Sequence, residues 1–217
     1  MSEQAREFLK VVKMLSDNGF LDHVVLIGSW AEYLYQNVGL LPKGTTALRT
    51  LDIDFLIKNL RKPQPPMDLE DVAFKEGFAI DKHPLLGTTK IRTASRLEIE
   101  FLIDQKGAGL EHVYRTALGV TAQALRGLDL LLKETVSVEY MGLEITVPIP
   151  ESYVIHKILI NTDRKKTGKK EKDIQSILAI FPYLNKEKYQ ELVESRTKKQ
   201  QKIIDSFWAS YSLPTIK

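Results

Sequence analysis

The chain has 217 residues, of which 43% are hydrophobic and 27% charged, and its formal net charge is +3. This composition is typical of a globular protein with one sizeable core, and the small charge excess argues against a dedicated nucleic-acid binder. The absence of cysteine excludes disulfides and thiolate metal sites, so a hard cation such as magnesium is the favoured metal. No run approaches the roughly 18 apolar residues of a membrane span, and the N-terminus lacks the apolar segment of a signal peptide, so a cytoplasmic location is expected.

The first hundred residues alternate between helical and strand patterns. Residues 3–17 carry apolar side chains at helical spacing and are followed by Asn18-Gly19, which predicts a helix. The apolar run 24–27 ends at Gly28 and is typical of a buried strand. Residues 51–58 and 96–104 alternate apolar and polar side chains, which predicts two more strands. Further elements are expected as follows: a helix over 30–38, a loop over 39–50, a helix over 68–76 capped by Asp68, and strands over 78–82 and 88–93.

The second half of the chain becomes helical. Residues 107–126 are expected to be helical in pieces, and 137–140 and 143–147 flank Met141-Gly142 as a hairpin. Four helices are then expected, over 151–162, 170–180, 186–197 and 199–210. The predicted class is therefore α+β, with a core over residues 1–147 and a helical domain over 148–217.

Two aspartates stand on the polar face of the strand over 51–58. Asp52 and Asp54 are two residues apart, so a strand directs both side chains to one face. Carboxylates that close repel each other unless a cation lies between them, and phosphoryl transfer often uses metals held in this way. The alternative is an edge strand with two solvated aspartates, although aspartate is depleted in strands.

Two other features point to the same chemistry. Gly28-Ser29 joins a buried strand to a helix, where free N–H groups favour a phosphate, although this pair is also a good helix cap. The strand over 96–104 carries Glu98, Glu100 and Asp104 on one face, and one of these would complete a carboxylate triad. A strand with one face in solvent explains the same pattern without a metal.

In this order, Ile27-Gly28-Ser29-Trp30, Leu51-Asp52-Ile53-Asp54-Phe55 and Glu98-Ile99-Glu100-Phe101 resemble the DNA polymerase β-like nucleotidyltransferase superfamily. The resemblance implies a short mixed sheet flanked by helices, Mg²⁺ or Mn²⁺ as cofactor, and a nucleoside triphosphate substrate. The segment Arg49–Phe55, with arginine and threonine before Asp-x-Asp, is similar to small stand-alone prokaryotic members and to abortive-infection type nucleotidyltransferase toxins.

The resemblance covers about residues 20–180 and includes the helical half. Pro148-Ile149-Pro150-Glu151 leads into a helix with Lys157, followed by Arg164 and then Lys172-Asp173. In those families such a lysine and such a Lys/Arg-Asp pair belong to the nucleotide site. Lys157 on an otherwise apolar helix is alternatively a side chain that extends its charge into solvent.

The resemblance implies the following roles. Asp52, Asp54 and Glu100 would hold the metal and act in catalysis, while Gly28, Ser29, Arg49, Lys157 and Arg164 would bind the triphosphate. Asp173 would belong to the same nucleotide site by orienting Lys157 or Arg164. Glu100 is preferred to Glu98 because Glu100-Phe-Leu-Ile repeats the pattern of Asp54-Phe-Leu-Ile. Trp30 is bulkier than the residue of many relatives. The expected reaction moves a nucleoside monophosphate to a hydroxyl of a small molecule, a tRNA or a protein.

Two other functions remain open. One is a catalytically impaired protein of this fold that binds nucleotide or RNA, or acts as a toxin–antitoxin module, with an antitoxin or a second copy of the chain as partner. The other is an RNA-binding protein that uses the basic run 164–172, which is otherwise a solvated loop. Phe207, Trp208 and Tyr211 would stack on bases in such a protein, although docking of the last helix to the core is the favoured explanation for them.

Overall fold

The computed structural model describes residues 1–46, 50–106, 112–162 and 167–211. The chain divides into two compact units. The first comprises Met1–Leu34 and Arg49–Pro148, and the second comprises Tyr35–Leu48 and Ile149–Lys217. The domain boundary expected at residues 147 and 148 stays a prediction.

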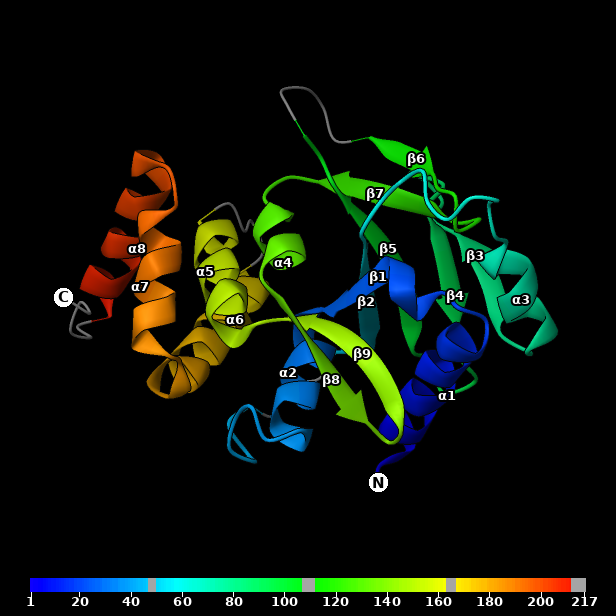
Figure 1. Ribbon diagram of the computed structural model, residues 1–217, viewed down its shortest axis with the longest axis horizontal. Helices are drawn as coiled ribbons and strands as arrows, with labels where there is room; N and C mark the ends of the chain where they lie inside the picture. The colour runs from blue at the N-terminus through cyan, green and yellow to red at the C-terminus, as the bar shows by residue number, and fades with distance from the viewer. Residues whose placement is uncertain (47–49, 107–111, 163–166, 212–217) are drawn as a thin grey trace. The chain divides into compact units, whose positions relative to one another are not determined.

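A mixed sheet forms the centre of the first unit (Figure 1). Its strands run in the order β1-β2-β5-β4-β3, and β7 pairs with both β5 and β6. The pairs β2–β5 and β5–β7 are parallel, and the remaining pairs are antiparallel. The strands are β1 (Val24–Ile27), β2 (Asp52–Ile57), β3 (Ala79–Lys82), β4 (Thr89–Arg92), β5 (Glu98–Asp104), β6 (Val113–Arg115) and β7 (Thr121–Leu125).

The two central strands have one dry face and one mixed face. On the dry face Ile53 and Phe55 of β2 and the apolar residues of β5 are buried, and the rings of Phe55 and Phe101 stack with centroids 6.2 Å apart. On the mixed face Val25 and Leu56 pack with Leu131 in an apolar cluster. Because β-strands alternate their side chains, the polar residues of β2 and β5 lie on this second face, next to that cluster.

Helices and a hairpin complete the first unit. They are α1 (Glu3–Asp17), α2 (Gly28–Asn37), which crosses into the second unit, α3 (Leu69–Lys75), α4 (Asp129–Lys133), a 3₁₀ turn (Leu21–His23), and the hairpin of β8 (Thr135–Tyr140) and β9 (Leu143–Pro148). The ring of Phe8 stacks on Trp30 at 4.4 Å, and the hydroxyls of Tyr33 and Tyr140 lie 2.8 Å apart. These aromatic contacts join α1, α2 and the hairpin.

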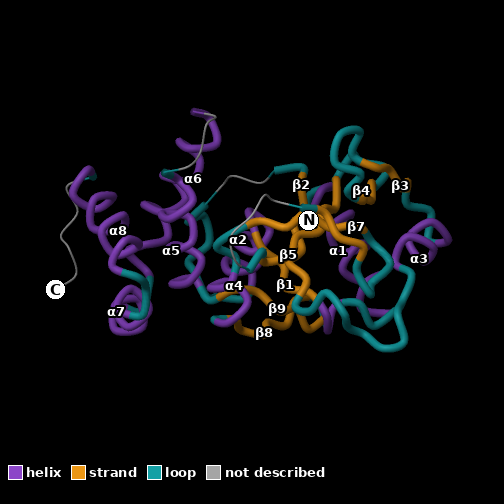
Figure 2. Tube along the Cα trace, turned by 90° about the horizontal axis from the view of Figure 1, so that it is seen from above, coloured by secondary structure: helices purple, strands orange, loops and turns teal. Residues whose placement is uncertain are grey.

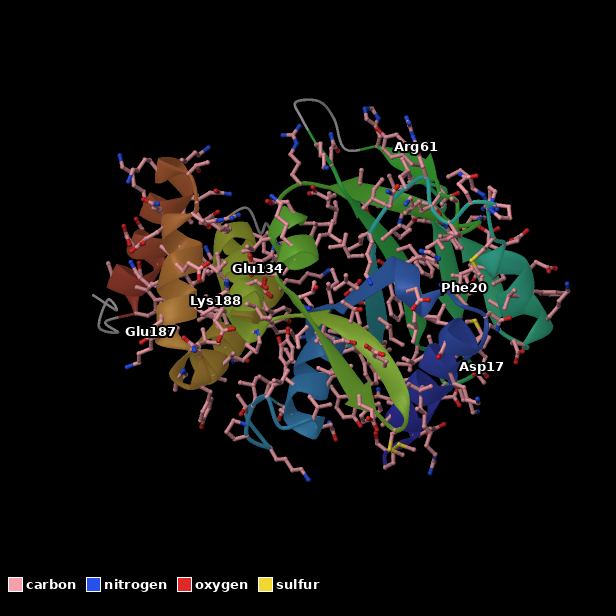
Figure 3. All side chains as sticks on the ribbon, viewed as in Figure 1. Asp17, Phe20, Arg61, Glu134, Glu187 and Lys188 are labelled. Atoms are coloured by element: carbon pink, nitrogen blue, oxygen red, sulfur yellow. The ribbon has the colours of Figure 1, made fainter. Side chains whose placement is uncertain are left out.

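At the end of α1 the chain passes from an exposed residue to a buried one within four residues. Asp17 is half exposed and pairs with Lys13 at 2.8 Å, whereas Phe20 is 1% exposed (Figure 3). Gly19, with a φ of +72°, makes the turn between them. The helix end that the sequence predicts at Asn18-Gly19 is therefore confirmed, since α1 ends at Asp17. Glycine adopts the left-handed backbone of this turn without strain.

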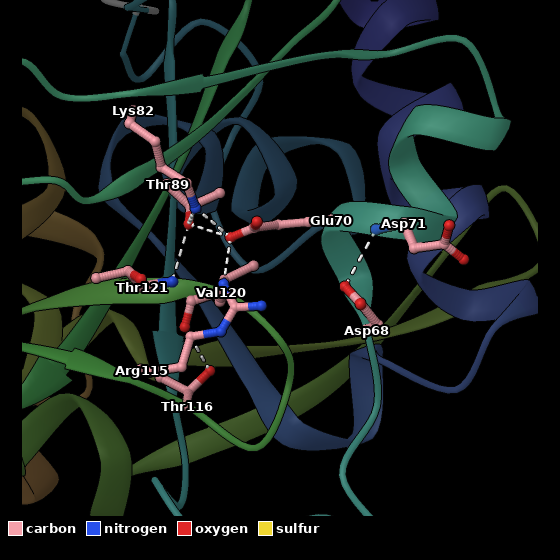
Figure 4. Close-up of polar contacts among 9 residues, drawn as sticks. All are labelled: Asp68, Glu70, Asp71, Lys82, Thr89, Arg115, Thr116, Val120 and Thr121. Carbon is pink, nitrogen blue, oxygen red and sulfur yellow. Dashed lines mark hydrogen bonds and ion pairs between the residues drawn. The ribbon is translucent and has the colours of Figure 1, made fainter.

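A polar network centred on Glu70 attaches α3 to the edge of the sheet (Figure 4). One oxygen of Glu70 accepts hydrogen bonds from Lys82 of β3, from Thr89 of β4 at 2.6 Å and from Arg115 of β6 at 2.6 Å. The backbone N–H of Thr121 donates to the Thr89 hydroxyl at 2.8 Å. A single carboxylate therefore links four elements.

The second unit contains α5 (Pro150–Asn161), α6 (Thr167–Ile180), α7 (Lys186–Glu194), α8 (Lys198–Ser210) and a 3₁₀ turn (Phe181–Tyr183). Helix α5 packs against each of the other three helices (Figure 2). The indole N–H of Trp208 donates to the hydroxyl of Tyr189 at 2.9 Å, and both side chains are buried. The packing interpretation of Trp208 is therefore confirmed.

The predicted α+β class, with a mixed sheet flanked by helices and a helical C-terminal region, is confirmed. The expectation of helical pieces over 107–126 is wrong where the structure describes the chain, because β6 and β7 lie there. Ala122, Ala124 and Leu125 have high helix propensity, but β7 pairs with β5 and β6 and both alanines are buried there, so tertiary packing overrides propensity. Among the described residues no helix combines the length and the apolar character that crossing a membrane requires.

Candidate active site: a carboxylate cluster on two parallel strands

Parallel pairing of β2 with β5 brings four carboxylates to one face of the sheet. Asp52 pairs with Glu98 and Asp54 with Glu100, and all four are partly buried. The register also aligns Phe55 with Phe101, so Glu100 occupies on β5 the place that Asp54 occupies on β2.

Three of these carboxylates lie close together. One oxygen each from Asp52, Glu98 and Glu100 can be chosen so that all lie within 4.8 Å of one another. Two oxygens bound to one magnesium ion are at most about 4.2 Å apart, twice the usual ligand distance. The limit of 4.8 Å on the observed spacing is therefore close to the largest separation that a shared cation allows.

Asp54 is held beside the start of α2. Gly28 begins that helix with a φ of +70°, a conformation that favours glycine. An ideal Cβ at this position would lie 2.7 Å from Oδ2 of Asp54. Gly28 therefore serves two purposes, the turn from β1 into α2 and the space for the Asp54 carboxylate.

Ser29 and Thr50 connect the same turn to the start of β2. The Ser29 hydroxyl accepts the backbone N–H of Thr50 at 3.1 Å and lies 3.1 Å from the Thr50 hydroxyl. The Thr50 hydroxyl in turn donates to the carbonyl of Asp52 at 3.1 Å. Ser29 therefore fixes the segment that leads into the two aspartates. Trp30, the next residue, is fully buried against Phe8 and takes no part in the cluster.

Two basic side chains of β4 face the carboxylates. The ammonium of Lys90 lies 2.7 Å from Glu98 and 2.5 Å from Glu100. Arg92 pairs with the second oxygen of Glu98 at 2.8 Å and with Asp81 at 2.6 Å. Hydrogen bonding from Lys90 lowers the pKa of Glu98, with a further contribution from the charge of Arg92. Glu98 is thus shared by two cations and Glu100 is paired with Lys90.

Sequence reasoning missed both basic residues. The signal that would have found them is the alternation of Lys90 and Arg92 on one face of a strand, two residues apart like Glu98 and Glu100. Antiparallel pairing places Lys90 opposite Glu100 and Arg92 opposite Glu98. Opposite charges at paired positions of neighbouring strands stabilise that pairing.

Asp104 lies at the other end of the acidic face of β5. Its Oδ1 accepts the backbone N–H of Leu128 at 3.2 Å, just before α4. Burial raises the pKa of Asp104, and the charge of Asp129 raises it further. Asp104 therefore connects the sheet to α4 and does not belong to the carboxylate group.

In the helical unit, Lys157 of α5 and Asp173 of α6 form an ion pair with Nζ and Oδ1 2.8 Å apart. Their side chains are 14% and 8% exposed. Nζ of Lys157 also lies 5.2 Å from the ring centroid of Tyr153. The alternative in which Lys157 extends into solvent is wrong, because its charged end is in this pair. Arg49 and Arg164, the two other basic residues expected at the nucleotide site, lie outside the described residues.

A mixed sheet whose neighbouring strands carry clustered carboxylates, beside a helix that begins at a Gly-Ser turn, defines the nucleotidyltransferase class of folds. Comparison with known proteins supports this conclusion. A family model described as nucleotidyltransferase matches residues 6–201, and the chain belongs to that family. No curated protein sequence matches at a significant level.

Three solved structures resemble the chain. An antigenic nucleotidyltransferase-like protein from Paracoccidioides brasiliensis is 14% identical, with 93% of this chain and 87% of that chain covered and a TM-score of 0.50. The antibiotic-resistance factor ANT(2'')-Ia is 11% identical, with 98% and 95% covered and a TM-score of 0.49. A tRNA nucleotidyltransferase complexed with a primer tRNA and an ATP analogue is 13% identical, with 93% and 60% covered and a TM-score of 0.29. The likeness to the first of these three structures supports the nucleotidyltransferase fold of the chain.

Proposed function

We propose that the protein transfers a nucleoside monophosphate from a nucleoside triphosphate to a hydroxyl acceptor, with release of pyrophosphate and with dependence on a divalent cation. The observation that carries the proposal is the carboxylate group on β2 and β5, next to a glycine that begins α2. Membership of the nucleotidyltransferase family supports the same reaction.

The ligands of the cation are proposed to be Asp52 and Glu100, which belong to the group of three close carboxylates, and Asp54, which is outside that group and lies beside Gly28. Carboxylate oxygens are the ligands that Mg²⁺ and Mn²⁺ prefer, so the donor set fits the cofactor. A bound divalent cation would polarise the reacting phosphate and offset charge on the leaving pyrophosphate. Glu100 is favoured over Glu98 because, among the ion pairs of the described residues, it has one cationic partner whereas Glu98 has two.

Glu98 and Glu100 differ in the ion pairs that would have to break before each could bind a cation. The ammonium of Lys90 neutralises part of the charge of both Glu98 and Glu100. Cation binding by Glu100 requires that this ion pair be released, whereas Glu98 can keep its bond to Arg92. We infer that Lys90 and Arg92 hold Glu98 in place as a positioning residue.

The triphosphate is proposed to contact Gly28, Ser29 and Arg49 in the core, and Lys157 and Arg164 in the helical half. The start of α2 provides backbone N–H groups that favour a phosphate. Asp173 orients Lys157 through their 2.8 Å ion pair. Catalysis on this view is mainly positioning and charge neutralisation, which is the general pattern for transfer between phosphate oxygens.

A catalytically impaired protein of the same fold is the second candidate. The observation that favours it is Lys90, since an ammonium between two carboxylates replaces the charge that a metal would supply. A relationship to the abortive-infection toxins, with an antitoxin as partner, belongs to this set of proposals. The acceptor is left open among a small molecule, a tRNA end and a protein hydroxyl.

The test uses the full chain with each α-labelled triphosphate, Mn²⁺ or Mg²⁺, and cell extract as a source of acceptors. Transfer of label and release of pyrophosphate are expected, and both should vanish in Asp52→Asn and Asp54→Asn. Asp17→Asn is the matched control, since it removes one exposed carboxylate at the end of α1. Metal-dependent binding of triphosphate without transfer to any acceptor would favour the impaired protein, and no binding at all would overturn the proposal.

A further inference from the structure

A groove with a volume of about 420 Å³ lies within the helical unit. It is formed by the end of α5, the start of α6 and one side of α8. The amide of Asn161, which is buried, donates to the carbonyl of Lys170 at 2.9 Å, so this hydrogen bond joins α5 to α6 between two residues that line the groove. The groove is therefore built into the packing of these helices.

The charge of the groove is positive. Lys170, Lys199 and Lys202 line it, and among the lining residues that the structure describes there is no aspartate or glutamate. Within the part of the chain that the structure describes, none of the three lysines has a carboxylate within ion-pair distance, and all three are exposed. Lys199 and Lys202 are three residues apart on α8, so they lie on the same side of that helix.

Aromatic side chains line the end of the groove nearest to the last turn of α8. The ring of Phe207 is almost fully buried, and the ring of Tyr211 lies 4.8 Å from it and is 37% exposed. Phe207 supplies a packed support, and Tyr211 leaves part of its ring accessible in the groove. Ile203 adds apolar surface between the lysines and these rings.

We propose that this groove binds single-stranded nucleic acid, with phosphates at the lysines and a base stacked on Tyr211. Unpaired cations and an accessible aromatic ring are the two components of sequence-tolerant single-strand binding. The volume lies in the range of small-ligand sites, roughly 300–1,000 Å³, which admits one or two nucleotides. An acidic peptide would satisfy the lysines but offers no planar ring for Tyr211.

The inference goes beyond the proposed transfer reaction and does not depend on it. Its described lining residues lie at the end of α5 and on α6 and α8 of the helical unit, and they include none of the residues proposed to bind the triphosphate or the cation. Lys170 comes from the basic run 164–172, and Tyr211 closes α8. The groove therefore gives part of that basic run and the terminal aromatic residue a common role.

The test is fluorescence anisotropy of a labelled 12-nucleotide single-stranded RNA or DNA with the full chain, in EDTA and without triphosphate. Lys199→Gln and Lys202→Gln should each weaken binding and reduce the slope of log affinity against log salt by about 0.7, the value per phosphate contact for single strands. Tyr211→Ala should weaken binding about 5- to 150-fold, as expected for about 1–3 kcal/mol per stacked base, with the slope unchanged.

Lys186→Gln, at the start of α7, is the matched control because it removes one exposed charge outside the groove. Equal weakening by Lys186→Gln and Lys202→Gln would mean binding through diffuse charge and would overturn the proposal. Competition by polyglutamate as effective as by unlabelled oligonucleotide would assign the groove to acidic peptides instead. Asp52→Asn should bind the oligonucleotide like the unchanged protein, so this result is independent of whether the chain transfers nucleotides.

Discussion

The carboxylate of Asp54 occupies the space that a side chain at Gly28 would require. An ideal Cβ on Gly28 would meet Oδ2 of Asp54 at 2.7 Å, closer than such atoms approach in proteins. The backbone of Gly28 has a φ of +70°, so the same residue also makes the turn from β1 into α2. The position of the Asp54 carboxylate therefore depends on the absence of a side chain at residue 28.

Gly28→Ala should therefore damage the site as well as the fold. The left-handed backbone costs about 1–2 kcal/mol for a residue with a Cβ, and Asp54 must move to relieve the contact. Gly77→Ala is the control, since Gly77 has a φ of +85° and no atom within 4 Å of its Cβ position. Thermal melts should show a loss of stability in both variants, but only Gly28→Ala should lose the melting-temperature shift caused by Mn²⁺. Equal Mn²⁺ shifts in the two variants would remove Asp54 from the proposed ligand set.

Glu98 and Glu100 should respond differently to the same substitution. Glu98→Gln removes a carboxylate that Lys90 and Arg92 both contact, and should lower the melting temperature in EDTA more than Glu100→Gln does. Glu100→Gln should remove Mn²⁺ binding in titration calorimetry and nucleotidyl transfer, whereas Glu98→Gln should keep measurable amounts of both. The opposite pattern would assign the third ligand to Glu98 and leave the fold unchanged.

Lys90→Met should separate the metal-free form from the metal-bound form. Removing the ammonium leaves Glu98 and Glu100 without the partner that lies 2.7 and 2.5 Å from them, so stability in EDTA should fall. The same change removes a positive charge that competes with a divalent cation, so the affinity for Mn²⁺ in calorimetry should rise. Unchanged or weaker Mn²⁺ binding in Lys90→Met would mean that Lys90 and the cation do not compete.

Glu70 predicts a pH dependence of stability. Burial acts to raise its pKa, but hydrogen bonds from Lys82, Thr89 and Arg115 outweigh burial, and the pKa lies below the ordinary value of 4.5. A carboxyl with a depressed folded pKa contributes stability that is present above its unfolded pKa and is lost as the pH falls through the folded pKa.

Glu70→Gln should consequently cost about 1 kcal/mol at pH 7, a value that allows for solvent screening of a partly exposed network. The difference in unfolding free energy from the unchanged protein should shrink below pH 4.5 and be small once Glu70 is protonated in both states. Chemical denaturation at a series of pH values measures it. A difference independent of pH would assign the effect of Glu70 to hydrogen-bond geometry rather than to charge.

The elements that carry strong local patterns were predictable. The alternation in β2 and β5 fixes both strands and the face on which Asp52 and Glu100 lie, because strand periodicity is a local property. The strands β6 and β7 were not predictable, because Ala122 and Ala124 have high helix propensity and their strand conformation results from pairing with β6 and β5. The ion pairs of Lys90 and Arg92 depend on which strand adjoins β5, and that order is a tertiary property that periodicity does not encode.

The ion pair of Lys157 with Asp173 changes what a substitution of Lys157 can test. Both side chains are largely buried, so Lys157→Ala removes the cation that lies 2.8 Å from a buried carboxylate and should cost on the order of 3 kcal/mol. A variant that only loses stability would say nothing about the triphosphate. A double variant, Lys157→Met with Asp173→Asn, removes both charges and keeps similar side-chain volumes.

The double variant should recover most of the stability lost in Lys157→Ala, since both charges of this ion pair are removed together. If Lys157 also contacts the triphosphate, the double variant should still show a raised KM for the triphosphate with a smaller change in kcat, because a contact present before the transition state has been lost. Steady-state kinetics together with thermal melts of both variants separate the two roles. Recovery of stability together with an unchanged KM would limit Lys157 and Asp173 to joining α5 to α6, and the positive charge for the triphosphate would then have to come from other residues.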